Sequence, residues 1–415
     1  MGRPLGSKNK PKVQLEKKPN GSVVMNIKME KQLEGMPVNR DSNQGWIRWG
    51  MRNDYPAKLS ELYYNSVTHK SCIDFAHTAI LGGGIDYDKM KLDSNDIRPN
   101  YQETWDNLLS NLIYDYLIYG AFAMQIIKNN DGKTYSFFHQ PFTQVRFGKR
   151  NDDGAIEKYY VCSDWSQTGL YVPVELDSFT FAEEEEIKSG KAYLYVYQSY
   201  SPMIDYYPVP HYITALKSIQ SEIELQRYDL RSITNNFSAS GILTLNRVDD
   251  EDEKEMIIQG ITAMYSGSDN ANSLIINFRN NDEEKPADFV DIGKSASNSV
   301  DLFNTCNERV LSKIIAAHKI TSKSLIGYDL EGASLGGDGN TMNVAFELYM
   351  KLFGYNIQNN IINSINNALA LNGIETQLFI KRLFDTTTDS SIGDTTTEET
   401  EKATDTNQNK GLNNE

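Results

Sequence analysis

The clearest hydrophobic pattern in the chain lies near its middle, in the segment YYPVPHYITALKSIQSEIELQRYDLRSITNNF (residues 206–237). Apolar residues recur there at alternating steps of three and four, and the charged residues lie mainly off this seam. Such a seam predicts one amphipathic helix packed against another helix, roughly 43 Å long. Pro208 and Pro210 suit its first turn, where a missing N–H costs nothing. The seam residues are Val209, Tyr212, Leu216, Ile219, Ile223, Leu230, Ile233 and Phe237.

A second long helix is predicted at 296–317, with one apolar face formed by Val300, Phe303, Cys306, Val310, Ile314 and Ala317. Between the two helices the pattern predicts a strand at SGILTLN, a helix over 250–265 and a strand at NSLIINF. The acidic residues at the start of the 250–265 helix suit the positive end of a helix dipole. Two long helices that flank a small α/β unit predict a stalk with a tip.

The rest of the chain predicts a mixture of helices and hairpins, so the fold class is α+β. A helix over 56–80 stops at Gly82-Gly83-Gly84, and another covers 101–119. Two hairpins turn at Asn130-Asp131-Gly132 and Asp152-Asp153-Gly154, and a further strand covers 191–200. A Gly-rich loop, IGYDLEGASLGGDGNT (326–341), precedes a last helix over 342–371 that Asn372-Gly373 closes.

Both ends of the chain are predicted to be disordered, which leaves a folded part from Trp46 to Phe384. Residues 1–18 have few apolar groups, and residues 386–415 are rich in Thr, Asp, Glu and Asn. The basic N-terminal arm partly resembles an AT-hook, but only Gly2-Arg3-Pro4 is present and the leading arginine is missing. A basic disordered arm is therefore the simpler interpretation. Its candidate nucleic-acid contacts are Arg3, Lys8, Lys10 and Lys12.

Composition narrows the functional classes. The net charge of the 415-residue chain is −15, which argues against a protein that grips nucleic acid over its whole surface. Tyr outnumbers Phe by 24 to 16, which suits half-buried surfaces such as subunit contacts. Three scattered cysteines argue against a disulfide framework or a zinc site. The longest apolar run, residues 117–124, is too short to span a bilayer, so we expect a soluble protein made in the cytoplasm.

No motif for catalysis, a cofactor or a metal is visible. Gly327 and Gly332 have P-loop spacing, but Ala333 and Ser334 follow where a P-loop has Lys and Ser or Thr. Without that lysine the loop lacks its contact to the β- and γ-phosphates. The five histidines show no HExxH and no close pairing in sequence. We therefore expect a protein that is not an enzyme and that does not hydrolyse ATP.

Taken in order, these segments resemble the portal proteins of tailed bacteriophages. The resemblance covers the chain from Trp46 to about Leu371, and the order of the elements carries it as much as single residues do. The segments are WIRWGMRNDYPAKLSELYYNSVTHKSCIDFAHTAILGGG, LIYGAFAMQIIKN, YYPVPHY, SASGILTLN, MYSGSDNANSLIINF and LSKIIAAHKITSKSLIG.

The resemblance implies a division of the chain into the parts of a portal subunit. A disordered basic arm (1–45) precedes a mixed α/β wing (46–207), and two stem helices (208–237 and 296–318) flank a small α/β clip (238–295). A tunnel-loop region (319–342), a long helix with a reduced crown (343–384) and a disordered acidic tail (385–415) follow.

The resemblance also implies a function. Portal proteins form a homo-oligomeric ring, normally of twelve subunits, at one vertex of the capsid. Double-stranded genomic DNA is packaged and ejected through the ring. The implied partners are the terminase large subunit, the major capsid or scaffold protein and a neck or adaptor protein, with no membrane. The implied location is the virion, after assembly in the host cytoplasm.

The same resemblance assigns two sets of residues. The DNA channel would be lined by the tunnel-loop residues Ala333, Ser334, Leu335, Gly336, Gly337, Asp338, Gly339 and Asn340. The clip docking surface would include Asp250, Glu251 and Asp252. The alternatives are another virion structural protein, such as a capsid or tail adaptor protein, a DNA-binding regulator that uses the basic arm, or an enzyme with a nonlocal active site.

Overall fold

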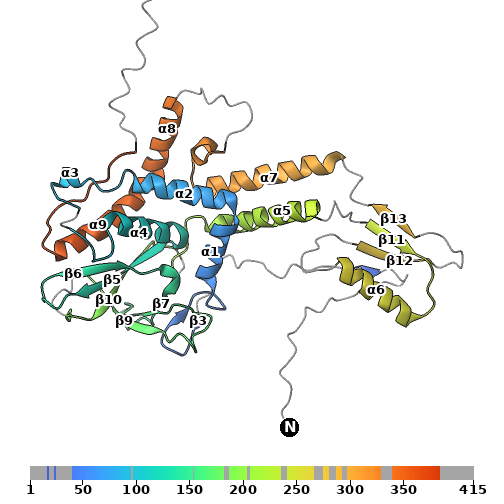
Figure 1. The fold of residues 1–415 in the computed structure, drawn as a ribbon, viewed down its shortest axis with the longest axis horizontal. Helices are drawn as coiled ribbons and strands as arrows, with labels where there is room; N and C mark the ends of the chain where they lie inside the picture. Colours follow the sequence, from blue (N-terminus) through green and yellow to red (C-terminus); the bar gives the residue numbers. More distant parts are fainter. Residues whose placement is uncertain are drawn as a thin grey trace, which may run out of the picture.

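The structure divides into a large body and a smaller tip, joined by two helices that run side by side (Figure 1). It is a computed structural model. It describes residues 16–17, 23–24, 40–94, 97–152, 154–181, 187–202, 206–234, 241–265, 274–279, 287–291, 297–328 and 339–383. We use "body" for residues 40–205 and 319–383, and "linker" for residues 206–215. The "stalk" is α5 (Leu216–Thr234) with α7 (Ser297–Ala317) and the adjoining His318, and the "tip" is the strands and helix beyond the stalk.

A six-stranded sheet forms one layer of the body, with strand order β6-β5-β10-β9-β8-β7. Only the β10–β9 pair is parallel among these six strands. The two predicted hairpins are confirmed as β5–β6 and β7–β8, whereas β9 was not predicted. The strands are β5 (Ala121–Lys128), β6 (Tyr135–His139), β7 (Val145–Phe147), β8 (Lys158–Val161), β9 (Val174–Ser178) and β10 (Ala192–Gln198). A short pair, β3 (Arg40–Asp41) and β4 (Ile47–Arg48), precedes them.

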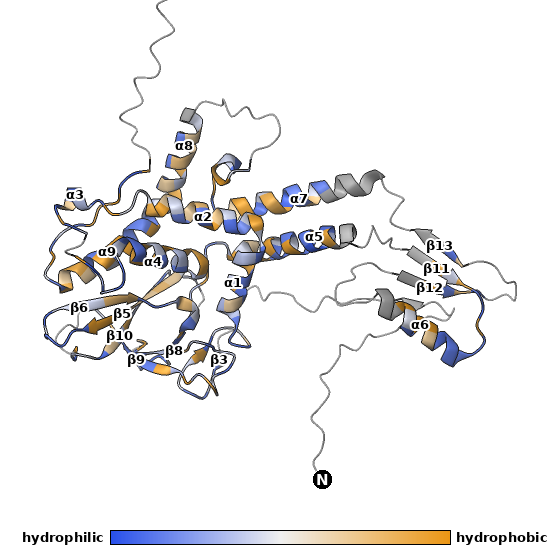
Figure 2. Cartoon of the chain, in the orientation of Figure 1, coloured by the Kyte–Doolittle hydropathy of each residue, from blue (hydrophilic) through white to orange (hydrophobic). Residues whose placement is uncertain are grey.

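Helices cover one face of this sheet, and the hydrophobic core lies between the two layers (Figures 1 and 2). The helices of this layer are α1 (Tyr55–Asn65), α2 (Val67–Leu81), α4 (Trp105–Tyr119) and α9 (Tyr355–Leu371). The short α3 (Tyr87–Met90) lies at its edge, and α8 (Gly339–Tyr349) projects away from the sheet (Figure 1). Large aromatic side chains dominate the core. Trp49, for example, is fully buried and stacks on Tyr207 with ring centroids 4.5 Å apart.

Two predicted helices of the body are interrupted. The helix predicted over 56–80 is two helices, because Ser66 adopts an extended conformation and caps α2 by accepting a hydrogen bond from the backbone N–H of His69. The helix predicted over 342–371 contains a π-helical segment, Met350–Gly354, between α8 and α9. The predicted helix ends are confirmed: α2 ends before Gly82 and α9 ends before Asn372-Gly373, and both glycines have positive φ.

The stalk helix α5 begins later than predicted. It starts at Leu216, after a 3₁₀ turn at Ile213–Ala215, so Pro208 and Pro210 lie in an irregular linker before it. A proline disfavours helical angles in the residue before it, which explains why Val209 does not start the helix. Nineteen helical residues correspond to roughly 28 Å. Leu230, predicted on the buried seam, is 66% exposed.

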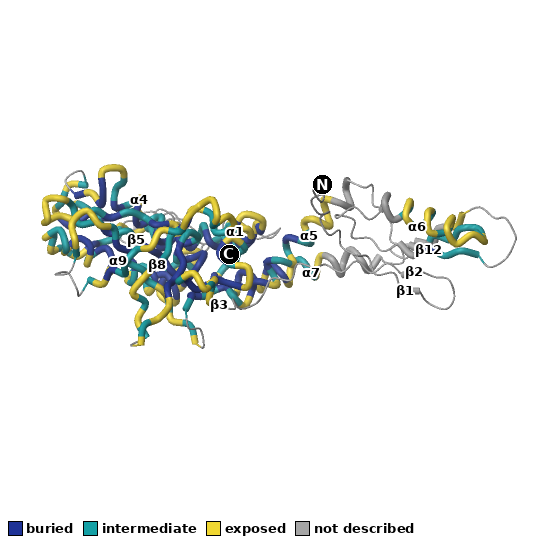
Figure 3. Tube along the Cα trace, turned by 90° about the horizontal axis from the view of Figure 1, so that it is seen from below, coloured by how far each residue is buried: buried dark blue, intermediate teal, exposed yellow. Residues whose placement is uncertain are grey.

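The tip is an α/β unit beyond the far ends of α5 and α7 (Figures 1 and 3). The predicted strands and helix are present, with β11 parallel to β12 and α6 between them in sequence. Strand β13 was not predicted, and neither were β1 and β2, which fall inside the arm predicted to be disordered. Strand β2 pairs with β12 through Val23 and Ile276. The elements are β1 (Glu16–Lys17), β2 (Val23–Val24), β11 (Gly241–Leu245), α6 (Glu251–Tyr265), β12 (Leu274–Phe278) and β13 (Asp288–Asp291).

Candidate stalk joint and assembly surfaces

A carboxylate on α5 ties the stalk to the start of α2. Glu222 Oε1 accepts hydrogen bonds from the hydroxyl of Thr68 at 2.6 Å and from its backbone N–H at 3.1 Å. The other oxygen, Oε2, accepts a hydrogen bond from the Ser66 hydroxyl. A helix N-terminus favours a negative charge, so the first turn of α2 is a suitable receptor for this carboxylate. The stalk is therefore held to the body by polar contacts of defined geometry as well as by apolar packing.

Three imidazoles form a hydrogen-bonded chain at the same joint. The distance from His69 Nδ1 to His318 Nε2 is 2.8 Å, and the distance from His318 Nδ1 to His211 Nε2 is 3.0 Å. His69 lies on α2, His211 in the linker before α5, and His318 directly after α7. His69 and His318 are fully buried, whereas His211 is half-buried. These three histidines are far apart in sequence, and the fold brings them together.

The linker before α5 is fixed to the body by two tyrosines. The Tyr212 hydroxyl donates a hydrogen bond to Ile118 O at 2.7 Å, and its ring stacks on that of His318. The Tyr207 hydroxyl donates to Ile47 O and accepts from the backbone N–H of Phe147. Burial raises the pKa of the Tyr212 hydroxyl well above its ordinary value, so Tyr212 stays neutral. These contacts set the direction in which α5 leaves the body.

The linker also passes very close to the C-terminal end of α4. Gly120 has a φ of +80°, and a Cβ at this position would lie 2.7 Å from Val209 O. Both facts favour glycine, because other residues rarely adopt this backbone conformation and the space for a side chain is absent. The sequence predicted a helix end near Gly120, but not this contact between α4 and the linker.

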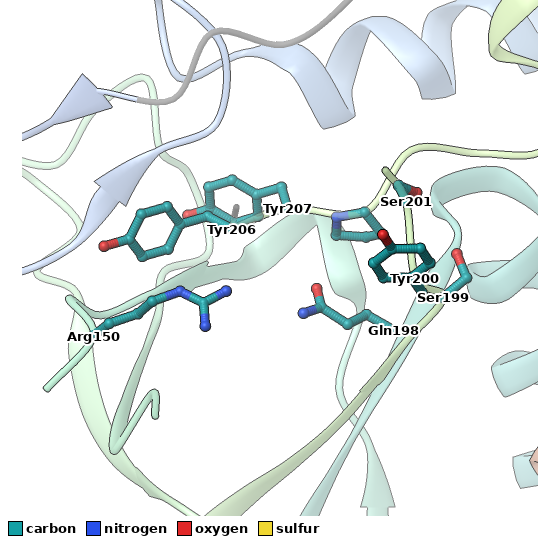
Figure 4. Close-up of a pocket in the computed structure, with 8 residues that line it drawn as sticks. Arg150, Gln198, Ser199, Tyr200, Ser201, Tyr206 and Tyr207 are labelled. Atoms are coloured by element: carbon teal, nitrogen blue, oxygen red, sulfur yellow. The ribbon is translucent and has the colours of Figure 1, made fainter. Parts of the chain in front are cut away.

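A hollow of about 660 Å³ opens beside the linker. In Figure 4 the guanidinium of Arg150 and the amide of Gln198 point toward each other across it. The Arg150 guanidinium lies 5.3 Å from the ring centroid of Tyr206 and donates a hydrogen bond to Gly154 O. Tyrosine and arginine side chains are enriched at protein contact surfaces. The hollow is lined by Arg150, Gln198, Ser199, Tyr200, Ser201, Tyr206, Tyr207 and Pro208.

Apolar side chains are exposed on two other parts of the body. On α8 and the π-helical segment, Val344, Leu348 and Leu352 follow one another at steps of four and are 61%, 46% and 65% exposed. Residues at this spacing share one face of a helix. The second part is the segment before and at the start of β9, where Leu170, Tyr171, Val172 and Val174 are exposed. Contiguous exposed apolar surface marks interaction sites.

The predicted docking residues lie at the tip. Asp250 directly precedes α6, and its carboxylate accepts a hydrogen bond from the backbone N–H of Asp252 at 2.9 Å. Glu251 forms an ion pair with Lys254 at 3.0 Å. All three acids are exposed, and this end of α6 is strongly hydrophilic in Figure 2. The structure thus presents a small acidic surface on the tip, which lies at the opposite end of the molecule from most of the body (Figure 3).

The other predicted site residues lie largely outside the described residues. This holds for Arg3, Lys8, Lys10 and Lys12 of the basic arm and for residues 333–338 of the predicted tunnel loop. Gly339 and Asn340, predicted as part of that loop, form the first residues of α8.

The described part of the chain contains no group of three or more His, Cys, Asp or Glu side chains arranged to hold a metal ion. In the imidazole chain, His318 presents opposite ring nitrogens to its two neighbours, so the three rings do not converge on one point. The helices described here all lack the combination of length and apolarity that a membrane span requires.

Comparison with known proteins identifies solved structures with a similar fold. No family profile and no curated protein sequence matches the chain. A chain from the neck of an empty gene transfer agent particle, computed with C6 symmetry, has a TM-score of 0.50 at 15% identity, covering 80% of this chain and 85% of that one. A chain of the native gene transfer agent virion has a TM-score of 0.48 at 14% identity, covering 80% and 84%.

A solved HK97-family phage portal protein from Corynebacterium diphtheriae also matches, with a TM-score of 0.39 at 11% identity, covering 75% of this chain and 88% of that one. At such identities the likeness is one of fold alone. The α+β fold of this chain is therefore similar to that of the gene transfer agent neck chain.

Proposed function

We propose that the protein is a portal-type subunit of a phage particle, which forms a ring at one capsid vertex through which double-stranded DNA is packaged and ejected. The observation that carries this proposal is the stalk: two adjacent helices leave an aromatic-cored body and hold a small α/β tip away from it. A catalytic domain has no need of such a stalk. The fold shared with a particle-neck chain supports the same interpretation.

Ring formation is supported by the exposed apolar surfaces. Val344, Leu348 and Leu352 on one side of the body, and the Leu170–Val174 segment on another, are different surfaces of one chain. Contacts between two different surfaces generate a ring when the rotation closes. The related neck was computed with C6 symmetry, which rings of six or twelve subunits both satisfy. We propose a ring of twelve.

In this ring the parts of the chain have separate roles. The body would form the wing that contacts the major capsid or scaffold protein, and the stalk helices would form the wall of the channel. The tip would be the clip, where the terminase large subunit docks during packaging and a neck or adaptor protein docks afterwards. The loop from Ala333 to Asn340 would line the channel. The proposed location is the virion, after assembly in the host cytoplasm.

Two features of charge fit a DNA conduit. The net charge is −15, and the only formal charges in EGASLGGDGNT are the acidic Glu331 and Asp338. Each phosphate contact strengthens binding and makes it salt-dependent, so a channel for sliding DNA benefits from few basic contacts. Packaging energy would come from a separate motor, because the chain lacks the P-loop lysine. The purified protein should therefore show no ATP turnover.

The assembly test replaces the exposed stripe with charge. We expect purified wild-type protein to form closed rings in electron micrographs and by native mass spectrometry. The double variant Leu348→Glu, Leu352→Glu should fold but lose the ring, because buried unpaired charges oppose the contact. The matched control Asn363→Glu, Asn367→Glu adds the same two charges at exposed polar positions further along α9 and should leave the ring intact. Wild-type protein that remains monomeric or dimeric at micromolar concentration would contradict the proposal.

The channel test shortens the loop between Ala333 and Gly339. We expect the fold and the ring to be preserved, while packaged DNA length or DNA retention falls in particles that carry the shortened loop. Particles with normal filling and normal retention would reduce this segment to a connector. The alternative of a capsid or adaptor protein would be favoured if the chain assembled into particles at many vertices instead of one.

A further inference from the structure

The imidazole chain of His69, His318 and His211 lies where the three segments that define the stalk joint meet. One ring comes from the body helix α2, one from the linker that leads into α5, and one from the residue that directly follows α7. Each of the two hydrogen bonds therefore joins two different segments. Breaking either bond removes a contact between body and stalk, or between the bases of the two stalk helices. None of the assembly surfaces described above uses these rings.

The number of protons on the rings decides whether both hydrogen bonds exist. Three neutral imidazoles carry one ring proton each, and each hydrogen bond needs one proton between two nitrogens. Two protons thus occupy the bonds and the third sits on an end nitrogen, either His69 Nε2 or His211 Nδ1. A fourth proton fills both ends, and a fifth must enter a bond and convert it into two opposed N–H groups.

The buried end of the chain makes even the fourth proton costly. His69 Nε2 is buried and has no hydrogen-bond partner. A proton on this nitrogen would be a buried donor without an acceptor, on a cationic ring removed from water. The half-buried His211 is the end nearer to solvent, so the neutral chain favours its third proton there.

The surroundings do not compensate a positive charge. None of the three rings hydrogen-bonds a carboxylate among the described residues, because the nearby Glu222 is engaged by Ser66 and Thr68. Lys319, next to His318, adds a second positive charge that opposes protonation of His211. Burial also raises the pKa values of Tyr212, Cys72 and Tyr349, so these groups stay neutral and supply no negative charge.

We propose that the imidazole chain is a proton-sensitive latch between body and stalk, closed when its three rings are neutral and released when they take up protons. All three rings belong to one chain, so the latch can close within a single subunit. The proposal therefore does not depend on the proposed ring. Acidification would loosen the stalk joint while the aromatic core of the body stays folded. The chemical signal is the proton itself.

The direction of the pH effect follows from the difference between the closed and open joint. In the closed joint, burial lowers the pKa of His69 and of His211 to about 3 and lowers that of His318 well below its ordinary value. In an open joint the rings meet water, and their pKa returns toward the ordinary value near 6.5. The open joint therefore binds more protons below pH 6.5. Its population should rise about tenfold per pH unit for each ring that takes up a proton.

Hydrogen exchange on the full chain, read by mass spectrometry, tests the latch. Exchange of peptides from Leu216–Ile223 and Val310–Ala317 would be compared at pH 7.5 and 5.5, after correction for the intrinsic pH dependence of exchange. We expect protection of these peptides to fall at least tenfold at pH 5.5, while α9 peptides change less than twofold. Equal protection of the joint at both pH values would overturn the proposal, whatever the oligomeric state found by native mass spectrometry.

Two variants separate the latch from general acid sensitivity. His211→Gln removes one titrating ring at the half-buried end but keeps a side chain able to hydrogen-bond His318, and should reduce the response about tenfold. His77→Gln is the matched control, because His77 is also buried but stacks on Tyr114 and contacts Ser110 outside the chain. It should keep the full response. A response that His77→Gln removes, or that His211→Gln leaves unchanged, would contradict the latch. If His211→Gln does not fold, the comparison of wild-type exchange at pH 7.5 and pH 5.5 is by itself the test of the latch.

Discussion

The body and the tip bury their side chains to very different degrees. The body has a continuous core that includes Trp49, Trp105, Phe122 and Tyr349, all essentially inaccessible to water. Among the tip side chains that the structure describes, Ile276 alone is buried, and Met256 on α6 is 68% exposed. Figure 3 shows this contrast along the long axis of the molecule.

This difference indicates where each part obtains its stability. Burial of apolar surface is the dominant favourable contribution to folding, so the body is stabilised by its own core. The tip gains little from its described side chains and has surface left for contacts with other chains. A subunit built in this way can keep a rigid body while its tip adapts to more than one partner. The following predictions test that contrast.

The largest effect is expected from truncation of the body core. Trp49→Ala removes the ring that stacks on Tyr207 and meets Phe142 edge-on at 5.5 Å. We expect a loss of about 3–5 kcal/mol in the free energy of unfolding, as is typical of large-to-small substitutions in a core. Chemical denaturation followed by tryptophan fluorescence and circular dichroism would measure it.

The matched substitution in the tip is Met256→Ala. It should change the free energy of unfolding by no more than about 0.5 kcal/mol, as expected for an exposed site. Equal losses for Trp49→Ala and Met256→Ala would show that the tip is as tightly packed as the body, and the comparison would fail.

The stalk joint should show an intermediate effect. Glu222→Ala leaves the Ser66 and Thr68 hydroxyls and the Thr68 N–H without their acceptor. Loss of a partner for partly buried donors costs about 1–3 kcal/mol. Glu224→Ala, two residues further along α5, removes an exposed ion pair with Arg227 and should cost under about 0.5 kcal/mol. Equal thermal stability of the two variants would show that the joint contributes no more than the stalk surface.

The sequence predicted the order and type of most elements, because periodicity is a local property. Periodicity predicted the two stalk helices, both hairpins and the strand–helix–strand unit of the tip. The order of these elements then suggested the resemblance in fold. Errors arose both from local capping and from contacts distant in sequence. Ser66 interrupts a helix because its side chain caps α2. The linker before α5 is irregular because a proline follows Val209 and because Tyr207 and Tyr212 are hydrogen-bonded to the body.

Only part of the stalk joint could have been predicted from the sequence. Antiparallel stalk helices bring the start of the first beside the end of the second, so His211 and His318 could have been predicted to meet. His69 gave no such signal, because its approach depends on how α2 packs against α7. Short strands such as β1 and β2 were missed because two-residue elements carry no detectable period.

At the tip, substitution should affect partner binding more than stability. Replacing Asp250, Glu251 and Asp252 with Asn, Gln and Asn removes three negative charges from an exposed helix start. We expect a change below about 1 kcal/mol in stability, from lost helix-dipole interactions. If the proposed ring forms, binding of the proposed partners, the terminase large subunit and the adaptor protein, should weaken when measured by surface plasmon resonance on it. Loss of the ring would instead show that these acids are structural.

The smallest effect is expected at the turn of the β5–β6 hairpin, an exposed site on the otherwise well-packed body. The Asp131 carboxylate accepts hydrogen bonds from the Thr134 hydroxyl and from the backbone N–H groups of Lys133 and Thr134, which lower its pKa to about 2. Because the folded pKa lies below the unfolded value of about 3.9, the charged form contributes stability above pH 4. That contribution is lost as the pH falls toward 2. Asp131→Asn should therefore lower Tm by about 2 °C or less at pH 7, and the difference from wild type should shrink between pH 4 and pH 3. A difference that stays constant over this range would show that the carboxylate charge is not the cause. If Asp131→Asn lost as much stability as Trp49→Ala, the exposure of a side chain would not predict how much it stabilises this protein.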